Sequence, residues 1–535
     1  MDRALVESLR DLTGEERGAG AGRPAEAPVR MVMAYPSPYS VAMSSLGYLQ
    51  ILRLANARSE TMCERAVLPS RPDLERHRRT RTPLLTLESH RPVGDADLIG
   101  ISHAYELEMT GIVELLELSG LEPYAKDRSS RDPLVVLGGP ITFSNPLPSS
   151  AFADLVILGE AEGTLPRLLE YLEREPGAAR GDARARAVLL ETLAHEPGFY
   201  VPSVHRGHLP PIGQAPDHAL PARSAIWTPR AELSNMMLIE PERGCHRGCT
   251  FCVMRRSTNG GMRLVPPERV LEMVPEDVER VGLVGAAVTD HPGIKTILRG
   301  LIDDKGKRIG ISSLRADRLD AEFLQLLHRG GYRSLTVALD AASRRLRDVI
   351  EKNIRDRHIE NVLNLAKQVG MRHLKLYVIV GLPGESKEDR AELVELLLEL
   401  RRTLPIVLGV SPFVPKFHTP LADSPFAGEK AVKAMLHELE RSLRGKVEVR
   451  GPGAREAWVE YRLAQGGPEH AQAAVAAARE GGGLGAWKRA LKDLPERFRP
   501  DNFEALVPSP TRRRGRERRA REEGLLPVLA GDRLG

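Results

Sequence analysis

Short apolar runs alternate with amphipathic segments over the first 200 residues. The runs VRMVMAYP, DADLIGISHA, DPLVVLGGP and ADLVILGE have the pattern of buried strands, whereas SSLGYLQILRLAN and ELEMTGIVELLELSG have helical periodicity. Strands that alternate with helices predict an open parallel α/β sheet. Such sheets bind ligands at the carboxyl ends of their strands, which here are residues 35–39, 102–105, 138–145 and 159–162.

A second series of apolar runs starts near residue 231. Helical patterns such as EDRAELVELLLELRR separate these runs, so the series also indicates βα units. Six such units predict a partial (β/α)6 barrel, smaller than the barrel of eight units. The predicted strands span residues 236–240, 281–288, 308–313, 334–340, 373–381 and 405–413.

The pattern divides the chain into segments of different character. A loop rich in proline follows the last predicted strand, and helical periodicity dominates after it. We therefore predict a parallel α/β domain, a partial barrel and a helical C-terminal region. The segments are an N-terminal extension (1–28), the α/β domain (29–200), a linker (201–230), the barrel (231–425), the helical region (426–508) and a basic tail (509–535).

Composition and charge exclude several classes of protein. The chain has 535 residues, of which 42% are hydrophobic and 28% charged, which is typical of globular domains. No apolar run reaches the roughly 18 residues of a membrane span, and the charged first 20 residues do not resemble a signal peptide. The basic segment 512–521 has no interleaved aromatic residues, so the chain's net charge of +5 does not indicate a nucleic-acid partner. We expect a cytoplasmic protein that does not bind membranes.

Three of the four cysteines, Cys245, Cys249 and Cys252, lie within PERGCHRGCTFCVMRR. This stretch directly follows the first predicted barrel strand, at the end of the barrel that carries catalytic loops. Thiolates suit iron–sulfur clusters and zinc, and three ligands to a four-iron cluster leave one metal position open for a small molecule. The alternative is a structural zinc site with His246 or His291 as the fourth ligand, although such sites usually have two separated ligand pairs.

The spacing Cys-x3-Cys-x2-Cys, with Phe251 before the last cysteine, resembles the signature of the radical S-adenosylmethionine (SAM) superfamily. This resemblance implies a [4Fe–4S] cluster on the three cysteines and SAM on the fourth iron. It also implies that SAM is reduced by one electron and cleaved to a 5′-deoxyadenosyl radical. The electron donor would be a protein such as flavodoxin or ferredoxin.

Later segments resemble the parts of that barrel that hold SAM. Thr289–Pro292 replaces a GGEP-like turn and keeps only its proline, and SSLRAD supplies Arg315 for the SAM carboxylate. Asp340 stands where a subfamily often has glutamate, and YVIVGLPGE resembles the turn that packs on the adenine. The cofactor-binding residues implied are Phe251, Thr289, Asp290, Ser312, Arg315, Asp340, Gly381, Leu382 and Pro383.

The α/β domain resembles the cobalamin-binding domain that precedes the barrel in many radical SAM proteins, as in LVVLGGPITFSNPLP. Its first loop has no Asp-x-His-x-x-Gly, so no histidine is evident to ligate cobalt. Two alternatives remain: cobalamin binds without a protein ligand to cobalt, or the domain binds nothing and packs on the barrel. A bound ligand would contact the turn at Gly138 and Gly139, and His103 is a further candidate contact.

We predict a SAM-cleaving iron–sulfur enzyme whose radical chemistry acts on an unidentified small molecule or peptide, with cobalamin-dependent methyl transfer as one form of that chemistry. The alternatives are a non-radical cobalamin and SAM methyltransferase, an RNA-modifying enzyme and a zinc-stabilised binding protein. Cys63 is the only cysteine outside the triad, so a second cluster lacks ligands, which argues against the methylthiotransferases. No catalytic side chain is predicted.

Overall fold

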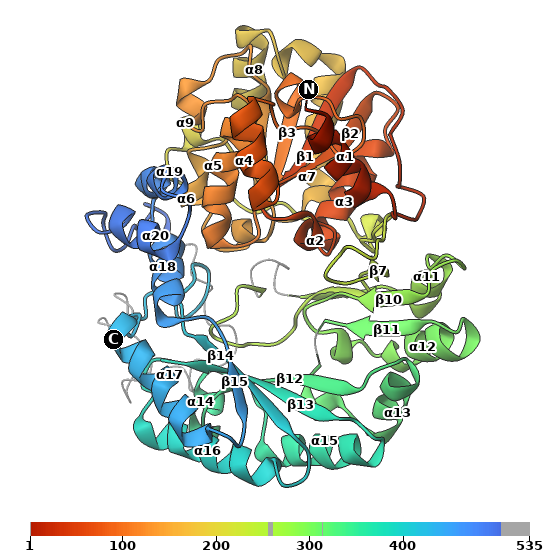
Figure 1. Ribbon diagram of the computed structural model, residues 1–535, viewed down its shortest axis with the longest axis vertical. Helices are drawn as coiled ribbons and strands as arrows, with labels where there is room; N and C mark the ends of the chain where they lie inside the picture. Colours follow the sequence, from red (N-terminus) through yellow and green to blue (C-terminus); the bar gives the residue numbers. More distant parts are fainter. Residues whose placement is uncertain (1, 255–260, 313, 504–535) are drawn as a thin grey trace. The chain divides into compact units, whose positions relative to one another are not determined.

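The computed structural model describes residues 2–254, 261–312 and 314–503, and its backbone contacts divide it into two compact units (Figure 1). The first unit comprises the chain up to Ile239 together with Gln465–Phe503, and the second comprises Glu240–Ala464. The predicted basic tail 509–535 lies outside the described residues. Within the described ranges, no helix is both long and apolar enough to cross a membrane.

The first unit contains a six-stranded sheet in the order β2-β1-β3-β4-β5-β6. The strands are β1 (Val29–Tyr35), β2 (Thr61–Val67), β3 (Leu98–Ser102), β4 (Leu134–Gly138), β5 (Leu155–Ile157) and β6 (Phe199–Tyr200), and β7 (Met236–Ile239) ends the unit's first segment. The helices are α1 (Arg3–Thr13), α2 (Tyr39–Ala42), α3 (Leu46–Asn56), α4 (Arg71–Thr80), α5 (Met109–Leu118), α6 (Leu147–Ser150), α7 (Ala161–Arg174), α8 (Ala183–Ala194), α9 (Pro202–His205), α19 (Ala471–Arg479) and α20 (Leu484–Ala490).

Strands β1 to β5 pair in parallel, and β6 pairs antiparallel to β5. The apolar runs fill these strands because both faces of a parallel sheet are covered by helices. The order 2-1-3-4-5 is that of flavodoxin-like folds, in which the topological switch point lies between β1 and β3. The parallel α/β fold of this domain is therefore as predicted.

The edge strand β2 was not predicted, because its sequence TMCERAV carries charges inside a buried strand. Arg65 in this strand is fully buried and pairs with Glu16 at 2.7 Å and with Glu88 at 2.6 Å. A buried guanidinium is tolerated where carboxylates compensate it. Since Glu16 follows α1, this ion pair also attaches the N-terminal extension to the sheet.

The last described helices belong to the first unit, although the barrel separates them from it in sequence. Helix α19 packs against α5, and α20 packs against α19. Trp487 in α20 is 1% exposed, and Asn145 donates a hydrogen bond of 2.8 Å from Nδ2 to the carbonyl of Gly466. The helical region predicted for 426–508 thus divides between the units at residue 464.

The second unit continues the βα series. Its strands are β8 (Glu242–Gly244), β9 (Met262–Leu264), β10 (Arg280–Leu283), β11 (Arg308–Ile311), β12 (Ser334–Ala341), β13 (His373–Val380), β14 (Ile406–Pro412) and β15 (Glu448–Arg450). Its helices are α11 (Pro267–Glu272), α12 (Ile294–Arg299), α13 (Ala321–Arg329), α14 (Arg344–Val349), α15 (Asp356–Gln368), α16 (Lys387–Leu400), α17 (Glu429–Leu443) and α18 (Ala454–Ala464).

The βα strands of the second unit pair in parallel within two sheets. Strand β10 pairs with β11, and β12, β13, β14 and β15 form a four-stranded sheet in sequence order. Each of the six predicted barrel strands coincides with one of β7 and β10 to β14. Strand β15 was not predicted, because EVR is too short to show periodicity. Strands β8 and β9 form an antiparallel pair that flanks the cysteine segment.

Candidate active site

The cysteine triad emerges from the paired strands β8 and β9. The amide of Cys245 donates to the carbonyl of Gly261 at 3.1 Å, which closes the base of the loop. The amide of Arg247 donates to Cys245 Sγ at 3.4 Å, and the amide of Cys252 donates to the carbonyl of Cys249 at 3.2 Å. An amide that points at a sulfur stabilises a thiolate there, so the loop's backbone is suited to hold cluster ligands.

All three thiols are largely shielded from water and lie close to one another. Burial raises the pKa of each, for Cys252 to about 12. The negative charge of the neighbouring thiolates adds to this effect at Cys249 and Cys252. Thiols with raised pKa values must release their protons when they bind metal, so cluster assembly at this loop is coupled to deprotonation.

An ion pair holds the loop to the 3₁₀ helix Val288–Asp290, which follows β10. Arg247 donates from Nε and Nη2 to the carboxylate of Asp290 at 2.8 and 2.6 Å, and Arg318 donates to the same carboxylate at 2.9 Å. The Asp290 side chain is 0% exposed. Burial raises the pKa of Asp290, but the arginines outweigh burial and leave this pKa below its ordinary value. Asp290 is therefore ionised and fixes the cysteine loop.

A second attachment joins the loop to the segment after α14. The amide of Thr250 donates to the carbonyl of Ile350 at 3.1 Å. Gly248 approaches Glu351 so closely that a Cβ at this position would lie 2.7 Å from Glu351 Oε2. Glu351 has a φ of 56°, in the left-handed region. The loop is thus held from two sides.

Two predicted SAM contacts, Arg315 and Asp340, lie in one charged group with Lys352. Asp340 forms an ion pair with Lys352, and Arg315 Nη2 donates to the Lys352 carbonyl at 3.2 Å. Burial raises the pKa of Cys249, and the charges of Lys352 and Arg315 oppose that rise. These cations therefore act directly on the environment of Cys249. Asp340 has a φ of 63°, where β12 shifts register against β13.

Two other predicted contacts link neighbouring strand ends. The Thr289 hydroxyl accepts a hydrogen bond of 3.3 Å from the amide of Arg315. The Ser312 hydroxyl accepts from the amide of Gly285 at 3.0 Å and donates to its carbonyl at 2.9 Å. Both side chains thus support the carboxyl edge of β10 and β11. Their contact with SAM, like that of the half-buried Phe251, stays a prediction.

The predicted adenine turn lies at the carboxyl end of β13. The carboxylate of Glu385 accepts from the amides of Gly381 at 2.8 Å and Leu382 at 3.3 Å, and it pairs with Arg390 at 3.0 Å. Leu382 is 3% exposed, and Pro383 is half-buried. Glu385 therefore shapes the turn from beneath, and the contact of the turn with adenine stays a prediction.

Glu242 was missed by sequence reasoning. Its Oε1 accepts from the amide of Ala287 at 2.8 Å, whereas its buried Oε2 has no hydrogen-bond partner among the described residues. Burial raises the pKa of Glu242 to about 7. Arg247 and Arg318 were missed as well. In the sequence, Glu242 and Arg247 are close to the cysteines, and Arg318 is close to SSLRAD. This closeness does not show that Glu242 meets Ala287 or that the arginines meet Asp290.

The histidines near the triad are already engaged. His291 Nε2 lies 3.0 Å from the carbonyl of Val265, and its Nδ1 accepts from the amide of Gly293 at 2.9 Å. His246 Nδ1 lies 3.4 Å from Met262 Sδ. In the described part of the chain, no three Cys, His, Asp or Glu side chains are arranged around a single metal-ion position. In a four-iron cluster each thiolate binds its own iron, so the triad fits a cluster.

In the first unit, the predicted ligand edge is closely packed. Gly139 has a φ of 104°, and a Cβ there would lie 2.7 Å from the carbonyl oxygen of His103. His103 is 1% exposed, and its ring nitrogens lie 3.1 Å from Ser149 Oγ and 2.8 Å from the carbonyl of Tyr105. Burial lowers the pKa of His103 to about 4. His103 is therefore a neutral structural residue, while Gly138 lies at the end of β4 with space around it.

Comparison with known families gives two matches in series. The family described as radical SAM proteins, N-terminal, matches residues 47–202. The radical SAM superfamily matches residues 239–397, which include the triad and β8 to β13.

Individual proteins are also similar to this chain. An uncharacterised protein of Methanocaldococcus jannaschii is 28% identical over 69% of this chain and 78% of its own length. A tRNA-2-methylthio-N(6)-dimethylallyladenosine synthase of Nitratiruptor sp. is 27% identical, over 30% of this chain and 40% of its own length. Among solved structures, the radical SAM methyltransferase TsrM of Kitasatospora setae has a TM-score of 0.50 at 18% identity, over 73% of this chain and 74% of its own.

The βα series and the cysteine triad define an enzyme with the partial barrel of SAM-dependent iron–sulfur proteins. The family implies a [4Fe–4S] cluster and SAM as cofactors. The chain belongs to the radical SAM superfamily, and it carries the superfamily's N-terminal domain in front of the core domain.

Proposed function

We propose that this enzyme binds a [4Fe–4S] cluster through Cys245, Cys249 and Cys252 and uses it to cleave SAM reductively. When bound, the cluster would supply the electron that breaks a carbon–sulfur bond of SAM, which would give methionine and a 5′-deoxyadenosyl radical. The clustering of the three thiols on a loop anchored at the carboxyl ends of the strands carries this proposal. The substrate would be a small molecule or peptide with an unactivated C–H bond.

The protein's own residues position SAM and exclude water. Arg247 and Asp290 hold the cysteine loop, and the amide of Arg247 supports the sulfur of Cys245. We assign Arg315 to the SAM carboxylate because this guanidinium lies in the charged group beside Cys249. The turn from Gly381 to Pro383 would contact the adenine. A protein such as flavodoxin or ferredoxin would deliver the electron.

Anaerobic reconstitution with iron and sulfide tests this proposal. We expect the wild-type chain to bind about four irons per chain, and dithionite with SAM to yield 5′-deoxyadenosine. The variant Cys249→Ala should lose both the cluster and the product. The matched control is Cys63→Ala, which removes a buried thiol from β2 and should retain both. Stoichiometric colourless zinc in place of iron would refute the proposal.

We further propose that the radical chemistry is a methyl transfer and that the first unit binds the cobalamin it requires. The flavodoxin-like strand order favours it, because ligands bind at the switch point of such sheets. At that point Ser37 donates to Glu108 at 2.7 Å, which links the loops after β1 and β3. Since both nitrogens of His103 are engaged, the residues fit a cobalamin without this histidine as cobalt ligand.

Hydroxocobalamin distinguishes methyl transfer from other radical chemistry. The full-length, reconstituted protein would be mixed with hydroxocobalamin and separated by gel filtration. Co-elution with a shifted visible spectrum supports methyl transfer. Complete separation would exclude it and leave cobalamin-independent radical chemistry, without affecting the test of the cluster.

A further inference from the structure

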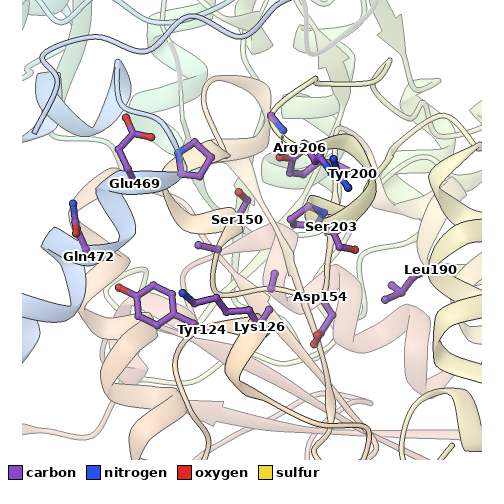
Figure 2. Close-up of a pocket in the computed structure, with 16 residues that line it drawn as sticks. Tyr124, Lys126, Ser150, Asp154, Leu190, Tyr200, Ser203, Arg206, Glu469 and Gln472 are labelled. Carbon is purple, nitrogen blue, oxygen red and sulfur yellow. Dashed lines mark hydrogen bonds between the residues drawn. The ribbon is translucent and has the colours of Figure 1, made fainter. Parts of the chain in front are cut away.

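The first unit contains a cavity of about 670 Å³ away from the predicted cofactor edge (Figure 2). Five parts of this unit line it: residues 124–126, residues 150–154, Leu190 of α8, residues 200–207 and residues 468–472. Residues 150–154 lead into β5, so the cavity lies at the amino end of that strand. The switch-point ligands of such sheets bind at the opposite, carboxyl edge. This cavity is therefore distinct from a cobalamin site.

Much of the wall is apolar. The ring of Tyr124, the almost fully buried Tyr200 and several small apolar residues form it (Figure 2). Drug-sized ligands occupy pockets of roughly 300–1,000 Å³ with mainly apolar walls and a few placed polar groups. The cavity thus has the size and lining of a site for an organic molecule. Its apolar lining residues are Ala125, Ala151, Ala153, Leu190, Pro202 and Pro468.

Two cations at the cavity have no acidic partner within the part of the chain that the structure describes. The Lys126 ammonium lies 5.4 Å from the centroid of the Tyr124 ring, and Arg206 lies beside Tyr200 (Figure 2). The acidic lining residue Asp154 already accepts hydrogen bonds from Arg128 at 3.2 Å and from the amide of Val135 at 2.8 Å. The charge of Asp154 is therefore compensated. The two cations outnumber Glu469, the other acidic residue that lines the cavity.

The backbone holds Arg206 at a fixed place. Arg206 ends helix α9 with a φ of 48°, and its amide donates to the carbonyl of Pro202 at 3.1 Å. The next amide, of Gly207, donates to the buried hydroxyl of Tyr200 at 3.1 Å. A non-glycine residue in the left-handed region is uncommon and is kept only where its surroundings enforce it. The turn thus fixes the Cα of Arg206 beside the cavity.

We propose that this cavity binds a small organic anion, with its carboxylate or phosphate group at Lys126 and Arg206 and its apolar or aromatic body against Tyr124 and the alanines. Arginine and lysine recognise such anionic groups by charge-assisted hydrogen bonds. The ring of Tyr124 offers a stacking surface for a planar body. The Ser203 and Gln472 side chains, which also line the cavity, add hydrogen-bonding groups.

Fluorescence titration with 8-anilinonaphthalene-1-sulfonate, an aromatic anion, tests the proposal on the full-length protein. We expect saturable binding by the wild type, competition by phenyl phosphate or benzoate, and none by the neutral benzyl alcohol. The double variant Lys126→Ala/Arg206→Ala should weaken binding at least tenfold. Preference between phenyl phosphate and benzoate identifies the anionic group.

The matched control is Arg184→Ala, an exposed arginine on α8 that does not line the cavity. It should bind the probe like the wild type. If the double variant is unstable by circular dichroism, Lys126→Gln/Arg206→Gln removes the charges with less change of shape. Absence of saturable binding, equal affinity in all variants, or competition by benzyl alcohol would overturn the proposal. The iron content of the triad should not change in any variant.

Discussion

Arg247, two residues after the first cysteine of the triad, forms a bidentate ion pair at 2.8 and 2.6 Å with Asp290, in the 3₁₀ helix Val288–Asp290 that follows β10. Because Arg318 also donates to Asp290, one buried carboxylate joins the cysteine loop to the segments that follow β10 and β11. Such bidentate contacts fix orientation as well as distance. The geometry of the cluster loop therefore depends on a residue that carries no thiol.

Asp290→Asn should reduce cluster assembly. The substitution removes the charge that two arginines share, so Arg318 loses its carboxylate partner and Arg247 keeps only the longer contact of 3.8 Å with Asp317. We expect iron content after reconstitution to fall severalfold, although all three cysteines remain. The control is Asp304→Asn, an exposed position of the second unit. Equal iron content in the two variants would show that Asp290 does not position the loop.

Gly285→Ala should destabilise the second unit by about 2 kcal/mol, as overpacking does. A Cβ at Gly285 would lie 2.2 Å from Glu242 Oε1, which is held by the amide of Ala287. Urea unfolding measures the cost, and Gly453→Ala is the control because a Cβ there meets nothing within 4 Å. The loss of stability caused by Gly285→Ala should be smaller in a Glu242→Ala background, since the clashing atom is absent there. Additive costs would contradict this explanation.

The stability of the cluster-free protein should depend on Glu242 between pH 4.5 and 7. Burial raises the pKa of this carboxyl from 4.5 to about 7, with Glu240 and Asp290 adding to the rise. Below pH 4.5 the group is protonated in both states, whereas between these values it ionises only in the unfolded chain. Its contribution is thus fully present below pH 4.5 and is lost as the pH rises to about 7, by up to about 3 kcal/mol.

Glu242→Gln measures that contribution, because the amide does not titrate. The difference in unfolding free energy between this variant and the wild type should shift in favour of the variant as the pH rises from 4.5 to 7, and then stay constant. Unfolding curves at pH 5, 6, 7 and 8 provide the measurement. A difference that does not vary with pH would mean that Glu242 is ionised in the folded state throughout.

Gly139→Ala should destabilise the first unit by about 1–3 kcal/mol without any ligand present. Gly139 has a φ of 104°, and its missing Cβ faces the His103 carbonyl at 2.7 Å. The neighbouring Gly138 is a close control, because a Cβ there meets Ile157 at an ordinary 3.9 Å. In thermal unfolding, the Gly139→Ala variant should have a lower midpoint temperature than the Gly138→Ala variant. Equal stability would mean that the turn is free to reshape around a ligand.

The sequence alone determined the βα series of both units and the place of the cysteine triad. Apolar runs identify buried strands because the faces of a parallel sheet are covered. The spacing of Cys245, Cys249 and Cys252 is local, so it is visible without any knowledge of the fold. The predicted strands β7 and β10 to β14 were found for these reasons.

Tertiary structure decided which distant residues meet. Strand β2 escaped prediction because Arg65 is buried only through Glu16 and Glu88, whose positions no local pattern encodes. The same holds for Asp290 with Arg247 and for the helices after residue 464, of which α19 packs on α5 and α20 on α19. Charges and glycines gain their roles from contacts across the fold, whereas periodicity and ligand spacing are properties of the chain itself.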